Sequence, residues 1–458
     1  MKSIAKRTAM VLILACMLLF GVLTFAIRYF LYAEKWVSFT GSPHLYTNGR
    51  LNTGEILDRD GEVLYSSAKG KSYSDNAQIR RATLHLMGDR VGNIPARVLR
   101  AYASRLTGYD KLNGTGALAS GGGTLELTVS AQVQSVALQA MNGRKGAVGV
   151  YNYRTGEILC ALSSPSFDPL DPPDLEKDNQ DGRYDGVYIY RFFHSAYTPG
   201  SIFKLTTLGA ALDELPDLKE RSFHCDGSLV INGETISCPK THGDQSLKEA
   251  LANSCNCAFA QITLDTGKSA LADQAEHIGI EEVREIDGIY TTKGHFDLSG
   301  ADDNSVAWAG IGQYTDLINP CQYMVYMGAI AAGGEAAEPY LVRSASRGGR
   351  ETYAVKRSYT DRMISTQAAA TLHTLMRYNV TKMYSSVDIP GLEVCAKSGT
   401  AEVGSDANTA TFAGFVDSEA YPLAFIVIVE EGGAGSSTCA PIARSVLEAC
   451  VNVLDAEH

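Results

Sequence analysis

The chain has 458 residues, 45% of them hydrophobic, and a formal net charge of −11. That length is enough for two or three domains that each bury a core. The acidic balance argues against nucleic acid as a partner, because no Lys/Arg-rich block is present to neutralise phosphates. The ten cysteines include no Cys-x-x-Cys pair with histidine partners, so we expect neither a bound metal nor a cofactor.

An uncharged run of 20 residues extends from Thr8 to Ile27, which matches the hydrocarbon thickness of a bilayer for a helix. Lys2, Lys6 and Arg7 precede it, so the positive-inside rule places the N-terminus in the cytoplasm and the rest of the chain outside. A cleaved signal peptide is the competing interpretation, but its apolar core would be overlong. We therefore expect an uncleaved, single-pass membrane anchor.

A glycine-rich break between Gly114 and Gly123 marks a domain boundary. The expected division is a cytoplasmic tail (1–7), a transmembrane anchor (8–31), a membrane-proximal pedestal (32–123) and a large domain (124–458).

Short-range patterns predict the elements in chain order. Asp60-Gly61 predicts a hairpin, and residues 86–106 a helix interrupted by Pro95. Beyond the break we expect a strand at 124–129, a helix at 131–141, a hairpin of 147–151 with 157–162, a buried strand at 423–429 and a helix at 441–454. Strands near both ends indicate one α/β sandwich domain whose sheet joins its termini.

A second hairpin is predicted between Cys225 and Cys238, with Asn232-Gly233 as its two-residue turn. The register leaves the two cysteines on a diagonal, close enough for a disulfide if the strand bends. Reduced, packed thiols are the equal alternative.

Ser201 and Lys204 lie three residues apart at the start of a predicted helix, which places them on one face. A serine hydroxyl becomes a good nucleophile only when a nearby base takes its proton, and a lysine with a lowered pKa can do so. The spacing alone is not specific, because it recurs at Ser3–Lys6 and Ser66–Lys69.

Two further segments make the pattern that begins with Ser201 and Lys204 specific. Ser254-Cys-Asn256 and Lys397-Ser-Gly-Thr400 follow at 53 and then 143 residues. Ser-x-x-Lys, Ser-x-Asn and Lys-Ser/Thr-Gly in this order are typical of penicillin-binding proteins and serine β-lactamases.

A competing copy of the first two elements runs from Ser66-x-x-Lys69 to Ser74-Asp-Asn76. These elements are too close together to form opposite walls of a cleft, and no Lys-Ser/Thr-Gly follows at comparable spacing. We expect this copy to be a polar surface loop.

The motifs from residue 51 to 443 resemble, in order, those of the class B penicillin-binding proteins. They are Gly54-x-Ile-x-Asp58-Arg59-x-Gly61, Thr155-Gly-Glu-Ile158, Ser164-Pro-Ser-Phe-Asp-Pro169, Tyr197-x-Pro-Gly-Ser201-x-Phe-Lys204, Ser254-Cys-Asn256, Gly310-Ile-Gly-Gln313 and Lys397-Ser-Gly-Thr-Ala-Glu402. One departure is Thr53, where the family usually has arginine. The resemblance implies an α/β (α+β) transpeptidase domain of the penicillin-binding/serine β-lactamase type, with a mainly antiparallel central sheet flanked by helices. A single transmembrane helix and a small α+β pedestal would precede it.

Members of that family are single-pass D,D-transpeptidases that cross-link peptidoglycan during elongation, division or sporulation. The resemblance therefore implies stem peptides ending in D-Ala-D-Ala as substrate and acylation by β-lactams. It also implies a polytopic glycan polymerase as partner, meeting the anchor and the residues before about 125.

The resemblance also implies catalytic roles. Ser201 would attack the carbonyl between the two D-alanines, with Lys204 as the base. Ser254 would relay a proton to the departing D-alanine, and Asn256 would hydrogen-bond Lys204 and the substrate amide. Lys397 would keep the site electropositive.

The third motif would bind the substrate. Ser398 and Thr400 would hold the terminal carboxylate, and Gly399 would leave room for the substrate against an edge strand. The backbone N–H groups of Ser201 and Thr400 would form the oxyanion hole.

Three alternatives to a transpeptidase are a β-lactamase, a membrane-anchored β-lactam sensor and a non-catalytic scaffold. Class A β-lactamases carry a Glu-x-x-x-Asn pattern, which is missing between Cys257 and Lys397. Class D enzymes usually have valine where Asn256 stands. Sensors usually have several membrane spans, and a scaffold has no need of three intact motifs.

Overall fold

The computed structural model describes residues 2–37, 46–47, 50–51, 54–67, 73–107, 122–403 and 407–456. Thr53, Lys69 and most of the predicted glycine-rich boundary lie outside the described residues.

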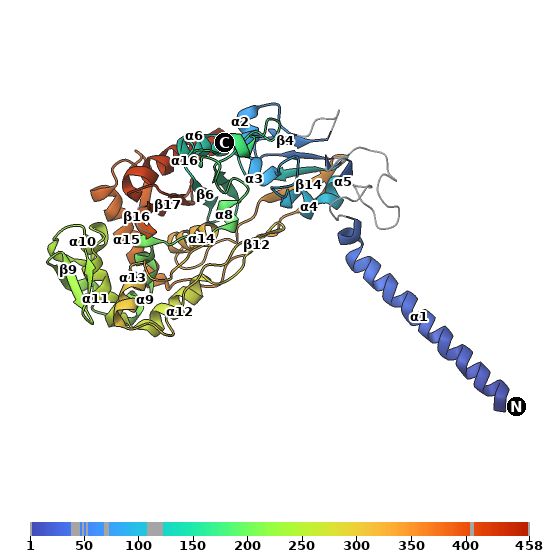
Figure 1. Cartoon of the computed structure of the whole chain (residues 1–458), viewed down its shortest axis with the longest axis horizontal. Helices are drawn as coiled ribbons and strands as arrows, with labels where there is room; N and C mark the ends of the chain where they lie inside the picture. Colours follow the sequence, from blue (N-terminus) through green and yellow to red (C-terminus); the bar gives the residue numbers. More distant parts are fainter. Residues whose placement is uncertain are drawn as a thin grey trace.

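Helix α1 (Lys2–Val37) stands apart from the rest of the molecule (Figure 1). Its segment Ile4–Ala33 is long and apolar enough to cross a membrane, and its large apolar side chains are exposed; Phe20, for example, is 72% exposed. An exposed apolar surface of this size is unfavourable in water. The length and composition of the helix suit a lipid environment instead. The N-terminal apolar helix that the sequence predicts is therefore present.

The central sheet has five strands in the order β16 (Glu393–Val403), β17 (Ala407–Asp417), β18 (Leu423–Val429), β6 (Gly146–Asn152) and β7 (Ile158–Ser164). Every pairing in it is antiparallel. The sheet joins the two ends of the large domain, as predicted.

Strand β18 shows that the central sheet is covered on both faces. All seven of its residues are buried, as expected for a continuous apolar run between two covered faces. Because side chains alternate across a strand, Phe425 and Val427 pack with α6 (Ala131–Met141) and α16 (Gly435–Ala456), whereas Ile426 and Ile428 belong to the core that includes α14 (Pro320–Ala331).

A second sheet contains β15 (Arg350–Ala354), β14 (Val342–Arg347), β5 (Thr124–Leu127), β3 (Glu55–Leu57) and β4 (Val63–Ser66), in that order. Strand β3 pairs parallel with β5. The predicted boundary between residues 123 and 124 therefore runs between strands of one sheet, and backbone hydrogen bonds join the N-terminal region to the large domain.

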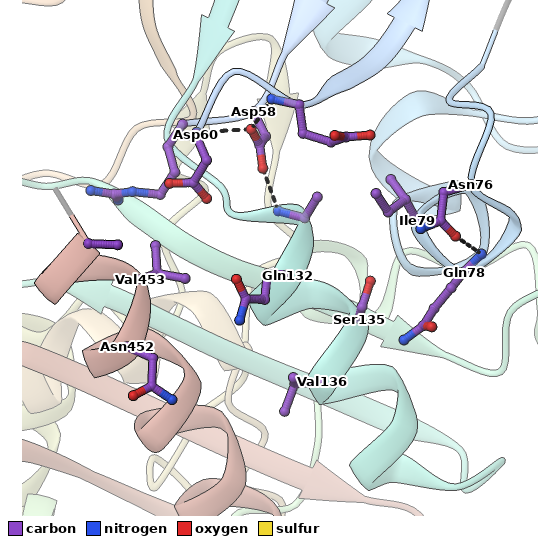
Figure 2. A pocket seen from close by; sticks show the side chains of 14 residues that line it. Asp58, Asp60, Asn76, Gln78, Ile79, Gln132, Ser135, Val136, Asn452 and Val453 are labelled. Atoms are coloured by element: carbon purple, nitrogen blue, oxygen red, sulfur yellow. Dashed lines mark hydrogen bonds between the residues drawn. The ribbon is translucent and has the colours of Figure 1, made fainter.

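The Asp58-Arg59 motif strengthens this junction. One oxygen of Asp58 accepts the N–H groups of Asp60 and Glu62 and closes the β3–β4 turn, while the other accepts the N–H of Ala131 at the start of α6. Figure 2 shows Asp58 between the hairpin and α6, beside a groove of about 710 Å³. Arg59 donates to the carbonyl of Thr128. The motif thus fixes the hairpin to the large domain.

Two local expectations for the N-terminal region are corrected. The predicted interruption at Pro95 is present, but the segment expected at 86–106 is more broken than predicted: Gly88 already ends α3 (Leu84–Met87), and α4 (Arg97–Ala101) and α5 (Ala103–Thr107) follow. The described part of the copy containing Ser66 and Ser74 is only partly a polar surface loop: Ser66 ends β4 and Ser74 is 3% exposed, whereas Asp75 and Asn76 are exposed at the start of α2.

The remaining elements do not belong to the two five-stranded sheets. They are β1 (Tyr46–Thr47), β2 (Arg50–Leu51), α2 (Ala77–Ala82), α7 (Leu175–Asp178), α8 (Arg191–His194), η2 (Gly200–Phe203), α9 (Lys204–Glu214), η3 (Leu218–Glu220), β8 (Ser222–Cys225), β9 (Ser228–Ile231), β10 (Glu234–Ser237), β11 (Gly243–Ser246), α10 (Leu247–Ala252), α11 (Asn256–Thr266), α12 (Lys268–Ile278), β12 (Glu285–Ile286), β13 (Ile289–Tyr290), α13 (Asp303–Gly310) and α15 (Thr366–Met383).

Candidate active site

Ser201 lies in the short 3-10 helix η2, and Lys204 is the first residue of α9. Gly200 starts the turn with φ of +58°, a conformation that favours glycine. A Cβ at Gly200 would lie 2.7 Å from the carbonyl oxygen of Thr400. The turn therefore brings Ser201 against strand β16 and holds it there.

Lys204 is completely buried, yet its amine has three polar neighbours. Its Nζ lies 2.7 Å from the carbonyl oxygen of Ser254, 3.2 Å from Ser254 Oγ and 2.8 Å from Asn256 Oδ1. Burial, with a smaller contribution from Lys397, holds the pKa of Lys204 well below its usual range. A lowered pKa favours the neutral form of this amine, which is the form that can accept a proton.

Ser254 lies between α10 and α11, at a φ of +53°, which is uncommon for a residue with a side chain. Its hydroxyl also lies 3.0 Å from Nζ of Lys397, which bonds the carbonyl oxygen of Ser398 at 2.7 Å. Burial lowers the pKa of Lys397 to about 7. Two buried amines thus meet at one hydroxyl.

Strand β16 is an edge of the central sheet, as an oxyanion hole there requires. Gln313 donates to the carbonyl oxygen of Thr400 at 3.1 Å, so this carbonyl faces away from β17. In an antiparallel strand the N–H and C=O of one residue point to the same side, so the N–H of Thr400 also faces away from β17.

Gly399 is expected to leave room for the substrate, but the structure gives a different reason for a glycine at this position. A Cβ there would lie 2.3 Å from Thr411 Oγ1 and 2.8 Å from the carbonyl oxygen of Pro199. The space that Gly399 leaves is therefore filled by the turn that carries Ser201, and not by free volume for a substrate.

These groups line a cleft of about 580 Å³, with both lysines buried behind its wall. The predicted site residues among its lining are Ser201, Ser254, Asn256, Ser398, Gly399 and Thr400. Other lining residues are Thr235, Ser237, Pro239, Asn253, Trp308, Ile311, Gln313, Glu402 and Asn408. The larger groove of Figure 2 has no serine–lysine pair in its lining.

Sequence reasoning missed Tyr384, whose buried hydroxyl accepts a hydrogen bond from Ser398 Oγ at 2.9 Å. Tyr384 follows α15, and no motif or spacing marks it in the sequence. The Ser398 hydroxyl is therefore oriented from behind the strand by a residue that folding alone brings there.

The expectation of no metal ligands also needs revision. The side-chain ligand atoms of Cys225, Cys238, His242 and Cys255 all lie within 4.8 Å of one another. Cys225 and Cys238 are both free thiols, so of the two sequence alternatives the structure has the reduced form. The four residues could hold a metal ion directly behind Ser254 and Asn256.

Comparison with known proteins agrees with this geometry. Residues 146–448 match the family described as "Penicillin binding protein transpeptidase domain". The peptidoglycan D,D-transpeptidase PbpA of Mycolicibacterium smegmatis is 30% identical over 372 residues, which are 72% of this chain and 73% of that protein.

Solved structures give the same result. Penicillin-binding protein A of Mycobacterium tuberculosis, as a penicillin G acyl-enzyme complex, matches with a TM-score of 0.72 and 25% identity, over 88% of this chain and 99% of that one. A chain of a peptidoglycan synthase complex matches in fold, with a TM-score of 0.62 and 23% identity, over 72% of this chain and 63% of that one. The protein belongs to the class B penicillin-binding proteins.

Proposed function

We propose that this protein is a serine D,D-transpeptidase that cross-links peptidoglycan stem peptides through an acyl-enzyme on Ser201. The observation that carries the proposal is the meeting of two buried amines, those of Lys204 and Lys397, at the hydroxyl of Ser254 beside the cleft that Ser201 lines. Such a site supplies a base that can take a proton, which is what activation of a serine requires.

In the first half-reaction, Ser201 Oγ attacks the carbonyl carbon between the two terminal D-alanines. Its proton passes to the neutral amine of Lys204. The N–H groups of Ser201 and Thr400 stabilise the oxyanion. Ser254, which contacts both amines, passes a proton to the nitrogen of the departing D-alanine as the C–N bond breaks, and an ester on Ser201 remains.

In the second half-reaction, the amine of a neighbouring stem peptide attacks the ester. That amine loses a proton by the reverse route, and Ser201 regains its own. Ser398, Thr400 and the charge of Lys397 act earlier, before the C–N bond breaks, by binding the carboxylate of the D-alanine that then leaves, while Asn256 holds Lys204 and the substrate amide. A β-lactam would enter by the same attack on its ring amide.

The location and partner of the enzyme follow from its N-terminal part. Lys2, Lys6 and Arg7 favour a cytoplasmic N-terminus, so α1 would cross the membrane and anchor the domain with the cleft on the extracytoplasmic side. The residues before about 125 would act as a pedestal and meet a polytopic glycan polymerase. The fold match to a chain of a peptidoglycan synthase complex supports a partner of this kind.

Labelling with a fluorescent penicillin tests the proposal. We expect a stable label on the wild-type protein, none on Ser201→Ala and full label on Ser66→Ala. Loss of the label within seconds would favour a β-lactamase, and no label on the wild-type protein would favour a scaffold. Incubation with two stem peptides, followed by mass spectrometry, then separates the cross-linked product from the hydrolysed one.

A further inference from the structure

We propose that Cys225, Cys238, His242 and Cys255 form a structural zinc site that positions the Ser254–Asn256 segment. The four residues come from four different segments: the end of β8, the residue after β10, the loop before β11 and the N-cap of α11. Three thiolates and one imidazole are a ligand set typical of closed, structural zinc sites.

The distances fit a tetrahedral ion. With Zn–S bonds of about 2.3 Å and a Zn–N bond of about 2.0 Å, neighbouring sulfurs lie about 3.8 Å apart, and sulfur and nitrogen about 3.5 Å apart. The Sγ atoms of Cys238 and Cys255 are 3.7 Å apart, and Cys225 Sγ is 3.4 Å from His242 Nδ1. One ion at the centre of the four atoms would need only small side-chain movements.

Backbone N–H groups point at the sulfurs. Cys238 Sγ accepts the N–H groups of Asn256 at 3.1 Å and of Cys257 at 3.4 Å. Cys225 Sγ accepts the N–H of Gly227, and Cys255 Sγ that of Ala258. Three of these four donors are in the first turn of α11, where the helix dipole favours negative charge. This arrangement stabilises thiolates, the form that binds a metal.

The two small sheets beside the cluster would be stabilised by a metal ion that links them. Strands β8 and β11 form one two-stranded sheet, and β9 and β10 form another. A two-stranded hairpin is only marginally stable by itself. A zinc ion would tie both sheets to α11, and its binding would release the protons of the three thiols to solvent.

The site lies immediately behind the catalytic segment. Cys255 stands between Ser254 and Asn256, and Cys238 follows Ser237, whose carbonyl oxygen accepts the amide N–H of Asn256 at 2.8 Å. Asn256 is therefore held between two of the ligands. Zinc would act on catalysis by fixing this residue, a consequence that rests on the proposed function.

The test is the zinc content of the full-length protein, purified in detergent with reductant and measured by elemental mass spectrometry. We expect a one-to-one ratio in the wild type. Cys225→Ser and His242→Ala should retain zinc against a competing chelator at least ~10-fold less well. Cys257→Ser is the matched control: its sulfur is 3.5 Å from Cys238 but outside the ligand set, so zinc should stay bound.

Two measurements on the wild-type chain remain decisive if variants fail to fold. Replacement of zinc by Co²⁺ should give the visible absorption of a tetrahedral thiolate complex, and a chelator should make the three ligand thiols newly reactive to alkylation. No metal after purification with added zinc, a Cys238–Cys255 disulfide as the main form in native membranes, or loss of zinc from Cys257→Ser alone would overturn the proposal. Ser201→Ala separates the two proposals, because it should lose the penicillin label and keep its zinc.

Discussion

The segments Ser254-Cys255-Asn256 and Ser74-Asp75-Asn76 have the same Ser-x-Asn spacing and entirely different surroundings. Asn256 and Ser254 bond a lysine from about 50 residues away, and Ser254 also bonds Lys397, 143 residues away. The second segment bonds nearby groups: Asn76 Oδ1 accepts the N–H of Gln78 at the start of α2, and Ser74 Oγ accepts that of Asn76.

The difference shows what a short motif leaves open. A serine and an asparagine two residues apart suit a helix cap as well as a proton relay, because both roles need an oxygen acceptor. The convergence of two buried amines at Ser254 distinguishes the copy that we propose to be catalytic. The experiments below test this distinction, from the largest expected effect to the smallest.

Lys204→Met should slow acylation by a β-lactam about 10²- to 10⁴-fold, since it removes the base and keeps a side chain of similar length. Folding should survive, because an apolar side chain in a fully buried position costs little compared with a buried amine. Stopped-flow acylation and the thermal midpoint measure the two effects. A rate near that of the wild type would place the base elsewhere.

Asn256→Ala should slow acylation by about 10- to 100-fold, the value of a hydrogen bond to a charged or basic partner. The matched change in the other copy, Asn76→Ala, should leave the rate unchanged. Equal losses in both variants would mean that the second copy also contributes to the cleft.

The acylation rate should depend on pH through both lysines. Burial lowers the pKa of Lys204, so the reactive neutral amine persists to a lower pH than in an exposed lysine and is lost as the pH falls through that lowered pKa. Lys397 must stay protonated to attract the carboxylate, and its pKa of about 7 predicts a decline above that pH. In Lys397→Arg, whose charge persists, the alkaline decline should disappear, whereas a decline that remains would rule out Lys397 as its source.

The sequence predicted those elements whose signals are local. The apolar run 423–429 matches β18, the Asn232-Gly233 turn joins β9 to β10, and the helix expected at 131–141 is α6. Each of the three motifs is a short pattern, so the sequence could identify it. In the structure, residues of all three line one cleft.

Long-range features could not be read in the same way. The parallel pairing of β3 with β5 joins segments on either side of a predicted boundary, and nothing in either segment specifies its partner. Tyr384 reaches Ser398 only through the packing of α15 against β16. The cysteine–histidine cluster was missed because its members are 13, 4 and 13 residues apart, without the Cys-x-x-Cys pair by which zinc sites are usually recognised.

The smallest expected effect is on the stability of α2. Asn76→Ala removes the side-chain acceptor of the helix cap, which should lower the free energy of unfolding of the N-terminal region by about 1 kcal/mol. Asn76→Asp, which keeps an acceptor oxygen, should restore most of it, as followed by urea denaturation or hydrogen exchange at 77–82. If neither variant changes the stability, the Ser74–Asn76 segment is not held by its cap, and the hydrogen bond from Arg80 to the carbonyl of Ser74 holds it instead.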